Sequence, residues 1–386
     1  MPRGRPSRSN LKTIRQDYPE TMTSLADLTT MRVGGPIATL IETASDGELI
    51  DAVREADANA TPLLVLGGGS NLLASDAGFD GVVVRDARRD VGANVTLIND
   101  GACGGLTITA AAGVSWDALV ERAVASQWSG FEAMSGIPGA VGATPVQNVG
   151  AYGAEVADVI AQVRTWDRHH GEVRTLPLMS CGFSYRNSLF KRSMSGGADD
   201  GRVWRPTPRY VILSVTFHVR MASLSAPIRY AQLAQALGVE EGARVPIADV
   251  RQAVLALRRS KGMVLDAADY DTWSAGSFFT NPIIDAATAA SLPDDTPRFP
   301  PGPHAPADSM KVSAAWLIEH AGFGKGFAIA ADAPASLSTK HTLALTNRGH
   351  ATAHDIVDLA RVIKTRVRER FGIELVPEPV TLGVDL

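Results

Sequence analysis

The sequence lacks the features that mark secreted, membrane-spanning and metal-binding proteins. Only two cysteines occur, Cys103 and Cys181, and neither has a histidine or cysteine beside it at metal-ligand spacing. We therefore expect two free thiols in a reducing compartment and no metal site. No stretch approaches the roughly 18 consecutive apolar residues of a membrane span, and no apolar run follows the basic N-terminus. A cytoplasmic protein without membrane insertion is expected.

Neither the charge nor the aromatic content favours a nucleic-acid partner. The chain has 37 basic and 41 acidic residues, a net charge of -4, and 6% aromatic residues. This balance creates no overall field that would attract nucleic acid, so an anionic ligand must be held locally. Residues 1–20 are basic and show no helical or strand period, so we interpret them as a disordered tail. A basic arm that binds nucleic acid is the less favoured alternative.

The residues that are present predict a globular protein of two or three domains. Its 386 residues are 45% hydrophobic and 20% charged, which is ordinary for folded domains. Strand-like and helical segments alternate, so the fold class is α+β. We predict strands over 39–42, 62–66, 81–85, 106–112 and 210–219, a hairpin of 159–166 with 172–176, and helices over 47–56, 116–124, 247–259, 312–321 and 353–371. Six prolines within 293–306 exclude regular structure there.

Two glycine-rich segments are candidates for a ligand site. The first, Gly67, Gly68, Gly69, Ser70 and Asn71, follows a buried strand, where glycines let backbone N–H groups converge on a phosphate. It is not the dinucleotide fingerprint of a Rossmann fold, because Leu72 stands where that motif needs glycine or alanine. A tight turn without function explains this loop equally well.

The second glycine-rich segment is longer and more apolar. Its candidate cofactor-binding residues are Ser135, Gly136, Ile137, Pro138, Gly139, Gly142, Ala143, Thr144 and Gly153. Two such segments in one domain suit a large flat ligand with a pyrophosphate at one end, and a flavin dinucleotide has that shape. Two purely structural loops are the alternative.

Several segments stand in the order and spacing of a known family. They are 66–72, 136–155, 183–191, 275–282 and 374–378, and the most specific are Gly-Ile-Pro-Gly-Ala-Val-Gly, Gln-Asn-Val-Gly-Ala-Tyr-Gly and Ala-Gly-Ser-Phe-Phe-Thr-Asn-Pro. Over roughly residues 21–383 the chain resembles the UDP-N-acetylenolpyruvoylglucosamine reductase (MurB) family of peptidoglycan synthesis. The resemblance implies non-covalent FAD, NADPH as hydride donor, and ping-pong reduction of UDP-N-acetylglucosamine enolpyruvate to UDP-N-acetylmuramate.

The resemblance also implies a division of the chain. Residues 21–90 and 91–265 would form a two-subdomain FAD-binding fold of the vanillyl-alcohol-oxidase type. Residues 266–372 would form a smaller α+β substrate-binding domain, and 373–386 a C-terminal strand that returns to the FAD domain. Residues 191–209 would be a flap over the substrate, with Trp204 in place of a tyrosine that relatives carry. A monomer is expected.

Three catalytic residues follow from the resemblance. Arg186 would bind the substrate carboxylate, Glu378 would act on the same developing enolate, and Ser277 would donate the proton. An ion-paired arginine, an edge-strand glutamate and a turn serine are the structural alternatives. The resemblance assigns the rest of the substrate to Tyr152, Tyr185, Lys261, Asn281 and His341, and His341 falls where some relatives carry glutamine.

Two other functions stay open from the sequence. Another FAD-dependent oxidoreductase of the same fold could act on a different small substrate. A covalent flavin would need a histidine or cysteine, and neither 67–71 nor 135–142 contains one. A nucleotide-binding module without catalysis would need the glycine loops but not Arg186, Ser277 and Glu378 together.

Overall fold

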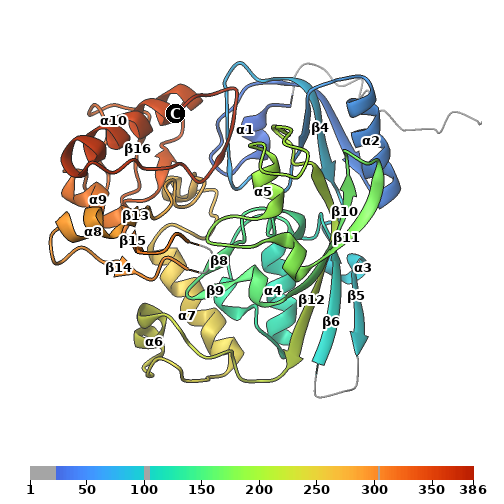
Figure 1. The fold of residues 1–386 in the computed structure, drawn as a ribbon, viewed down its shortest axis with the longest axis horizontal. Coiled ribbons are helices and arrows are strands. Elements are labelled where there is room, and N and C mark those ends of the chain that lie inside the picture. Colours follow the sequence, from blue (N-terminus) through green and yellow to red (C-terminus); the bar gives the residue numbers. More distant parts are fainter. Residues whose placement is uncertain (1–22, 100–104, 303–304) are drawn as a thin grey trace, which may run out of the picture.

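The computed structural model describes residues 23–99, 105–302 and 305–386 (Figure 1). The basic tail and Cys103 lie outside these ranges, whereas Cys181 is a buried free thiol. Within the described ranges, no helix is long and apolar enough to span a membrane. The same ranges contain no cluster of three or more histidine, cysteine or acidic side chains that could hold a metal ion.

The first unit is a three-stranded parallel sheet with a helix beside it. The strand order is β1 (Ile37–Thr43), β4 (Phe79–Asp86) and β2 (Leu63–Val65). Helix α2 (Asp46–Ala58) begins at Ser45, whose hydroxyl accepts the N–H of Glu48, and it buries Leu49 and Val53. The helix covers the first sheet and also contacts the second, because its core cluster includes Trp166 and Val211.

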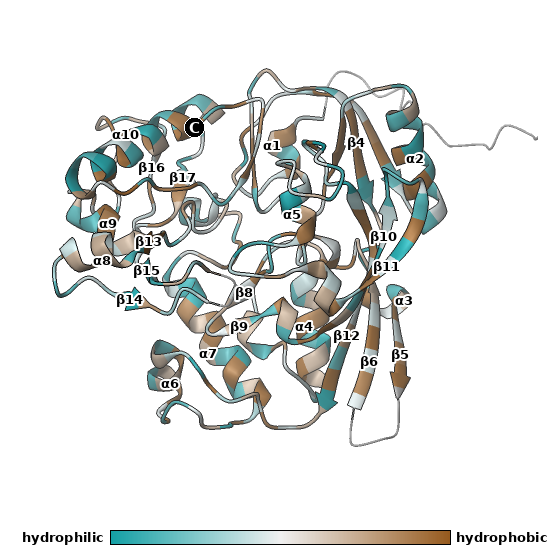
Figure 2. Ribbon diagram, in the orientation of Figure 1, coloured by the Kyte–Doolittle hydropathy of each residue, from teal (hydrophilic) through white to brown (hydrophobic). Residues whose placement is uncertain are grey.

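The second unit is a six-stranded antiparallel sheet. Its path runs β11 (Glu172–Pro177), β10 (Ile160–Asp167), β12 (Tyr210–Met221), β6 (Gly105–Ala111) and β5 (Val95–Asn99), with β7 (Trp128–Ser129) paired to β12. Helix α4 (Trp116–Ala125) packs Trp116, Leu119 and Val120 against it. Figure 2 shows brown, hydrophobic residues along much of β6 and β12, whereas the end of β12 is teal. The hairpin, α4 and α7 (Ile247–Ser260) form where the sequence patterns predict them.

The third unit lies on the opposite side of the molecule from α2 and β4 (Figure 1). It contains a small sheet in the order β13 (Ile283–Asp285), β15 (Ser309–Val312) and β14 (Arg298–Phe299). Helices α9 (Ala314–His320) and α10 (Ala353–Phe371) pack beside it. Helix α10 occupies the predicted range, where Thr352 caps it and Gly372 ends it in the left-handed conformation.

Two predictions for this unit were wrong in detail. The proline-rich segment contains one short strand: β14 forms from the two residues between Pro297 and Pro300. The helix predicted to begin at Val312 begins after Ser313, whose hydroxyl accepts the N–H of Trp316. Val312 is instead the end of β15, where its side chain is fully buried.

The chain ends against the first glycine-rich segment. Strand β18 (Val380–Leu382) pairs in parallel with β3 (Leu72–Ala74), which directly follows the glycine loop. The backbone N–H of Val380 donates to the carbonyl of Asn71 at 3.0 Å. This pairing brings Glu378 beside a loop that is more than three hundred residues away in sequence.

Candidate functional site

The two glycine-rich segments meet backbone to backbone. A Cβ on Gly68 would lie 2.6 Å from the Cα of Gly139, so no larger residue fits at position 68. The hydroxyl of Ser70 donates to the carbonyl of Pro138 at 3.0 Å, which ties the loops together. The loops predicted separately from sequence therefore form one wall.

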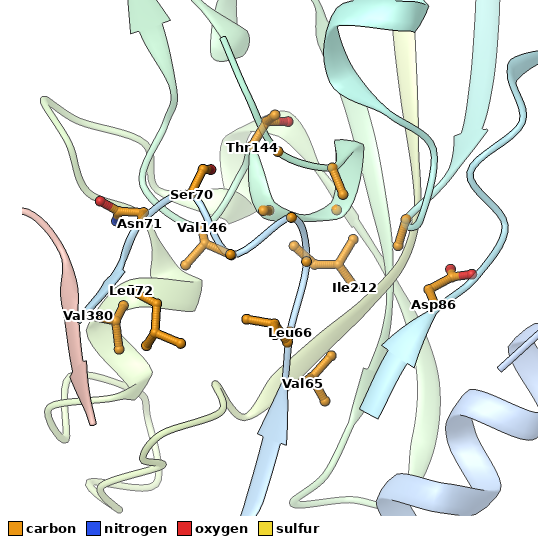
Figure 3. Close-up of a pocket in the computed structure, with 18 of the residues that line it drawn as sticks. Val65, Leu66, Ser70, Asn71, Leu72, Asp86, Thr144, Val146, Ile212 and Val380 are labelled. Atoms are coloured by element: carbon orange, nitrogen blue, oxygen red, sulfur yellow. The ribbon is translucent and has the colours of Figure 1, made fainter. Parts of the chain in front are cut away.

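A cavity of about 420 Å³ lies along this wall. Figure 3 shows the chain from Val65 to Leu72 crossing it, with Asp86 on one side and Asn71 and Val380 on the other. Among the described residues, no acceptor pairs with the backbone N–H groups of 67–70. Free donors beside a largely apolar cavity fit a dinucleotide, whose phosphates need donors and whose rings need apolar contacts.

Most of the predicted cofactor-binding residues line this cavity. They are Gly67, Gly68, Gly69, Ser70, Asn71, Ile137, Pro138, Gly139, Gly142, Ala143 and Thr144. The structure does not place Ser135, Gly136 or Gly153 on its wall. Ser135 is fully buried with its hydroxyl bonded to the carbonyl of Glu132, Gly136 donates to Asp117, and Gly153 packs against Arg229.

A second pocket of about 160 Å³ adjoins the first. The residues that line both pockets are Ser70, Asn71, Ile137, Pro138, Gln147 and Val149. Arg186, Ser277 and Glu378 all line the second pocket. The structure thus brings the three predicted catalytic residues into one place, next to the candidate cofactor cavity.

Glu378 is held by a cation and an amide. The Nε of Arg186 lies 3.2 Å from its Oε1, and the two side chains are only 22% and 12% exposed. The amide of Gln147 donates to the same oxygen at 3.2 Å. Asn71 donates both to the side-chain oxygen of Gln147 and to the backbone carbonyl of Glu378. This network connects the glycine loop to the acid.

Arg186 projects from a tight turn. Ser184 and Asn187 exchange backbone hydrogen bonds of 3.1 Å, and Arg186 has a positive φ of 51°. Its Nη2 donates to the carbonyl of Gly150 at 2.9 Å. The guanidinium is therefore fixed against the second glycine-rich segment and aimed toward Glu378.

Ser277 is placed by the buried residues that follow it. Phe278 and Phe279 are almost completely buried in the third unit, and the N–H of Glu378 donates to the carbonyl of Phe278 at 2.8 Å. The segments that carry Ser277 and Glu378 consequently run side by side. Within the described part of the chain, the Ser277 hydroxyl has no hydrogen-bond partner, which leaves it available to a ligand.

The five predicted substrate-binding residues line neither pocket. The hydroxyl of Tyr185 accepts the N–H of Asn281 at 3.3 Å, and the Asn281 side chain accepts from Ala314. Lys261 lies 5.7 Å from the ring centroid of Tyr152 and donates to Gln232. Burial, with the nearby charges of Lys261 and Lys325, lowers the pKa of His341 to about 4. Lys261 therefore lies close to both Tyr152 and His341, and these three residues form a cluster that lines neither pocket.

Trp204 does not line either pocket. It is 4% exposed, its indole N–H donates to Asp200, and its ring lies under Arg168 and Arg202. The end of the same segment is anchored through Arg209, whose fully buried guanidinium pairs with Asp167. The sequence reasoning that made Trp204 a candidate for substrate contact did not anticipate this packing.

Two side chains at the site were missed from the sequence. Gln147 lies within the motif Gln-Asn-Val-Gly-Ala-Tyr-Gly, so its position could have drawn attention. Lys191 follows the Arg186 turn and lines the larger cavity. No local pattern distinguishes Lys191 from an ordinary helix lysine, because its place on the cavity wall depends on the tertiary fold.

Comparisons with known proteins agree with this geometry. The model of the FAD binding domain family matches residues 37–177, and the model of the UDP-N-acetylenolpyruvoylglucosamine reductase C-terminal domain matches residues 268–382. These matches confirm the predicted fold class, an α+β FAD-binding fold followed by a smaller domain, and support FAD as the cofactor.

Relatives cover nearly the whole chain. The UDP-N-acetylenolpyruvoylglucosamine reductase of Cutibacterium acnes is 50% identical over 359 residues, 93% of this chain and 89% of that protein. That of Nocardia farcinica is 52% identical over 371 residues, 94% of this chain and 89% of its own. The solved structure of UDP-N-acetylenolpyruvylglucosamine reductase (MurB) from Thermus caldophilus has a TM-score of 0.56 at 24% identity, covering 93% of this chain and 97% of that one, and it supports the fold.

Proposed function

Because this chain belongs to the UDP-N-acetylenolpyruvoylglucosamine reductase family, we propose that it reduces the enolpyruvyl ether of UDP-N-acetylglucosamine to UDP-N-acetylmuramate. NADPH would be the hydride donor and FAD a non-covalent carrier. The observation that carries this proposal is the wall shared by the cavity along the glycine loops and the pocket of Arg186, Ser277 and Glu378.

FAD, when bound, supplies the capacity to accept a hydride from one substrate and to deliver it to the next. One pocket, lined by Arg186, Ser277 and Glu378, adjoins the cavity, so both substrates would have to reach the carrier through it. The two substrates would therefore use it in turn, which is a ping-pong sequence.

The chain's own residues would manage the charge of the second step. Adding a hydride to the enol ether puts negative charge on the carboxylate and on the adjacent carbon. Arg186 would pair with the carboxylate by charge-assisted hydrogen bonds, and Glu378 would act on the same enolate. Ser277 would donate a proton to the carbon. A serine is a weak acid, so this role depends on the neighbouring guanidinium.

The remaining residues would bind the rest of the sugar nucleotide. We assign the diphosphate to Lys261 and Asn281, with Tyr152 close to Lys261, and we count Tyr185 and the neutral His341 among the other substrate-binding residues. In this proposal residues 21–265 hold FAD, residues 266–372 hold the substrate, and the C-terminal strand returns Glu378 to the cofactor. The expected monomer stays a prediction.

The test is NADPH consumption by the purified protein under anaerobic conditions. We expect oxidation of NADPH beyond the one equivalent that reduces FAD only when UDP-N-acetylglucosamine enolpyruvate is added, with a product heavier than that substrate by two hydrogen atoms. UDP-N-acetylglucosamine, which lacks the enolpyruvyl group, is the matched control and should give no turnover. In a parallel aerobic assay, a protein that oxidises NADPH with oxygen and does not respond to the sugar nucleotide would be another FAD oxidoreductase of this fold.

A further inference from the structure

Lys191 is a cation at the site that has no part in the proposed roles of Arg186, Ser277 and Glu378. It lies in the short helix α5 (Leu189–Ser193), just after the turn of Arg186, and its side chain lines the larger cavity. Its Nζ donates to the backbone carbonyl of Arg186 at 3.3 Å. In the described part of the chain, no carboxylate oxygen lies within 4.0 Å of this Nζ.

The surroundings of Lys191 disfavour its charge. Burial lowers the pKa of its ammonium group, Glu378 opposes this shift, and Arg186 adds to it. A buried cation without a close anion is costly, whereas an anion that enters the cavity would compensate it. The structure therefore leaves a positive charge facing the space in which the cofactor fits.

The position of Lys191 along the cavity indicates which part of a bound ligand would carry the compensating negative charge. Its Nζ donates a hydrogen bond to the backbone carbonyl of Arg186, and the side chain of Arg186 lies with Glu378 in the adjoining pocket. Lys191 therefore stands at the end of the cavity nearest to the substrate pocket. The reacting ring of a hydride carrier must lie at this end, because the hydride has to pass between the two pockets.

We propose that Lys191 stabilises the negative charge of the two-electron-reduced flavin ring and so sets the reduction potential of bound FAD. This inference rests on the proposed function. The hydride from NADPH brings two electrons and one proton to a neutral ring, so the ring gains one hydrogen and one negative charge, and NADP⁺ leaves. When the hydride passes to the enolpyruvyl carbon, the ring becomes neutral again, and the substrate completes its reduction by taking one proton.

A second role would be purely structural. Lys191 could simply hold the carbonyl of Arg186 and thereby orient the turn. The two roles have different requirements. Holding the carbonyl of Arg186 requires only a hydrogen-bond donor, whereas stabilising the reduced flavin requires a positive charge. Lys191→Gln keeps a donor and removes the charge, and Lys191→Arg keeps both.

The test measures the midpoint potential of FAD bound to each variant by anaerobic reduction against a reference dye. Affinity for FAD is measured in parallel from the quenching of flavin fluorescence. We expect Lys191→Gln and Lys191→Met to lower the potential by an amount equivalent to at least a tenfold loss of preference for the reduced state, about 30 mV for a two-electron couple. Lys191→Arg should keep the potential close to that of the wild type, with a preference for the reduced state that changes less than threefold.

Arg89→Met is the matched control, because Arg89 is a cation that lines the same cavity but pairs with Glu42 at 3.4 Å, whereas Lys191 is hydrogen-bonded to the turn of Arg186. It should leave the potential unchanged. The inference is overturned if Lys191→Gln binds FAD with the wild-type potential, or if Arg89→Met lowers the potential as much as Lys191→Gln does. A wild-type protein that binds no FAD would instead refute the proposed function itself.

Discussion

At the scale of single side chains, the site is built around one carboxylate with two fixed partners. Glu378 faces Arg186 and Gln147, and neither partner can leave easily because both are tied to the glycine-rich segments. Ser277 faces the same pocket with a free hydroxyl. In the proposed function this arrangement separates two tasks: Arg186 and Glu378 would stabilise charge, and Ser277 would donate a proton.

Replacing Ser277 or Glu378 should affect one half-reaction only. In Ser277→Ala and Glu378→Gln, stopped-flow measurements should show reduction of FAD by NADPH within a few-fold of the wild type. Reoxidation by the enolpyruvyl substrate should slow by about 10²- to 10⁴-fold, the usual contribution of a positioned acid or base. Ser277→Cys keeps a proton donor and should lose less. Equal losses in both half-reactions would refute the assignment of the proton donor.

His341 should make stability depend on pH. Its pKa is about 4 in the folded protein, below the ordinary value of 6.5, so between these values the unfolded chain binds a proton that the folded one does not. This contribution is present in full above pH 6.5, where both states are neutral, and stability falls as the pH drops toward 4. His341→Gln removes this pH dependence. As the pH falls from 7.5 to 4.5, the unfolding free energy of the variant, measured with urea, should rise by roughly 2 kcal/mol relative to that of the wild type. An unchanged difference between the two proteins would contradict the buried neutral histidine.

At the scale of elements, the decisive feature is the contact between the two glycine loops. Gly68 touches the backbone of Gly139, and β3 and β18 then carry the chain past the same place. Neither loop alone would form the cavity wall. The candidate cofactor site should therefore be sensitive to added volume at this contact.

Gly68→Ala should disrupt this contact. Its new Cβ would lie 2.6 Å from the Cα of Gly139, and the loops would have to separate. We expect a loss of about 1–3 kcal/mol in urea unfolding and a loss of FAD binding. Gly47→Ala is the matched control, because a Cβ there meets only the Ser45 hydroxyl at 3.9 Å, and it should be neutral or stabilising by about 0.5–1 kcal/mol. Equal FAD content in the two variants would count against the loop contact as the cofactor wall.

Elements with strong local signals could be predicted from the sequence, and elements defined by distant pairing could not. Helix α10 carries its own cap, periodic apolar face and terminal glycine, and the hairpin of β10 and β11 has its turn between two alternating runs. The two residues of β14 form a strand only because β15 offers an edge to them. In the site, Arg186, Ser277 and Glu378 were identified through the family resemblance. The burial of Lys191 and Trp204 depends on tertiary packing that no local pattern encodes.

At the scale of the whole molecule, three units contribute to a single place. The first gives the loop of 67–71, the second gives the longer glycine segment and Arg186, and the third gives Ser277. The last strand adds Glu378. Since the units meet at these pockets, a ligand that fills them should stabilise the protein as a whole.

FAD should therefore raise the melting temperature of the protein in a concentration-dependent way. A ligand at 100 times its dissociation constant stabilises the folded state by about 2.7 kcal/mol. Calorimetry of FAD-free protein with increasing FAD should show this rise, and AMP, which lacks the isoalloxazine ring, should give a smaller one. A melting temperature that does not respond to FAD would place the cofactor elsewhere or exclude it.

The most direct test of the central claim, that a flavin lies between the glycine loops and beside Arg186, Ser277 and Glu378, is an anaerobic visible-absorption titration of the purified protein. We expect a yellow protein that one equivalent of NADPH bleaches, and whose colour one equivalent of UDP-N-acetylglucosamine enolpyruvate restores. A protein that is colourless after incubation with FAD, or one that NADPH bleaches and the sugar nucleotide does not recolour, would contradict it.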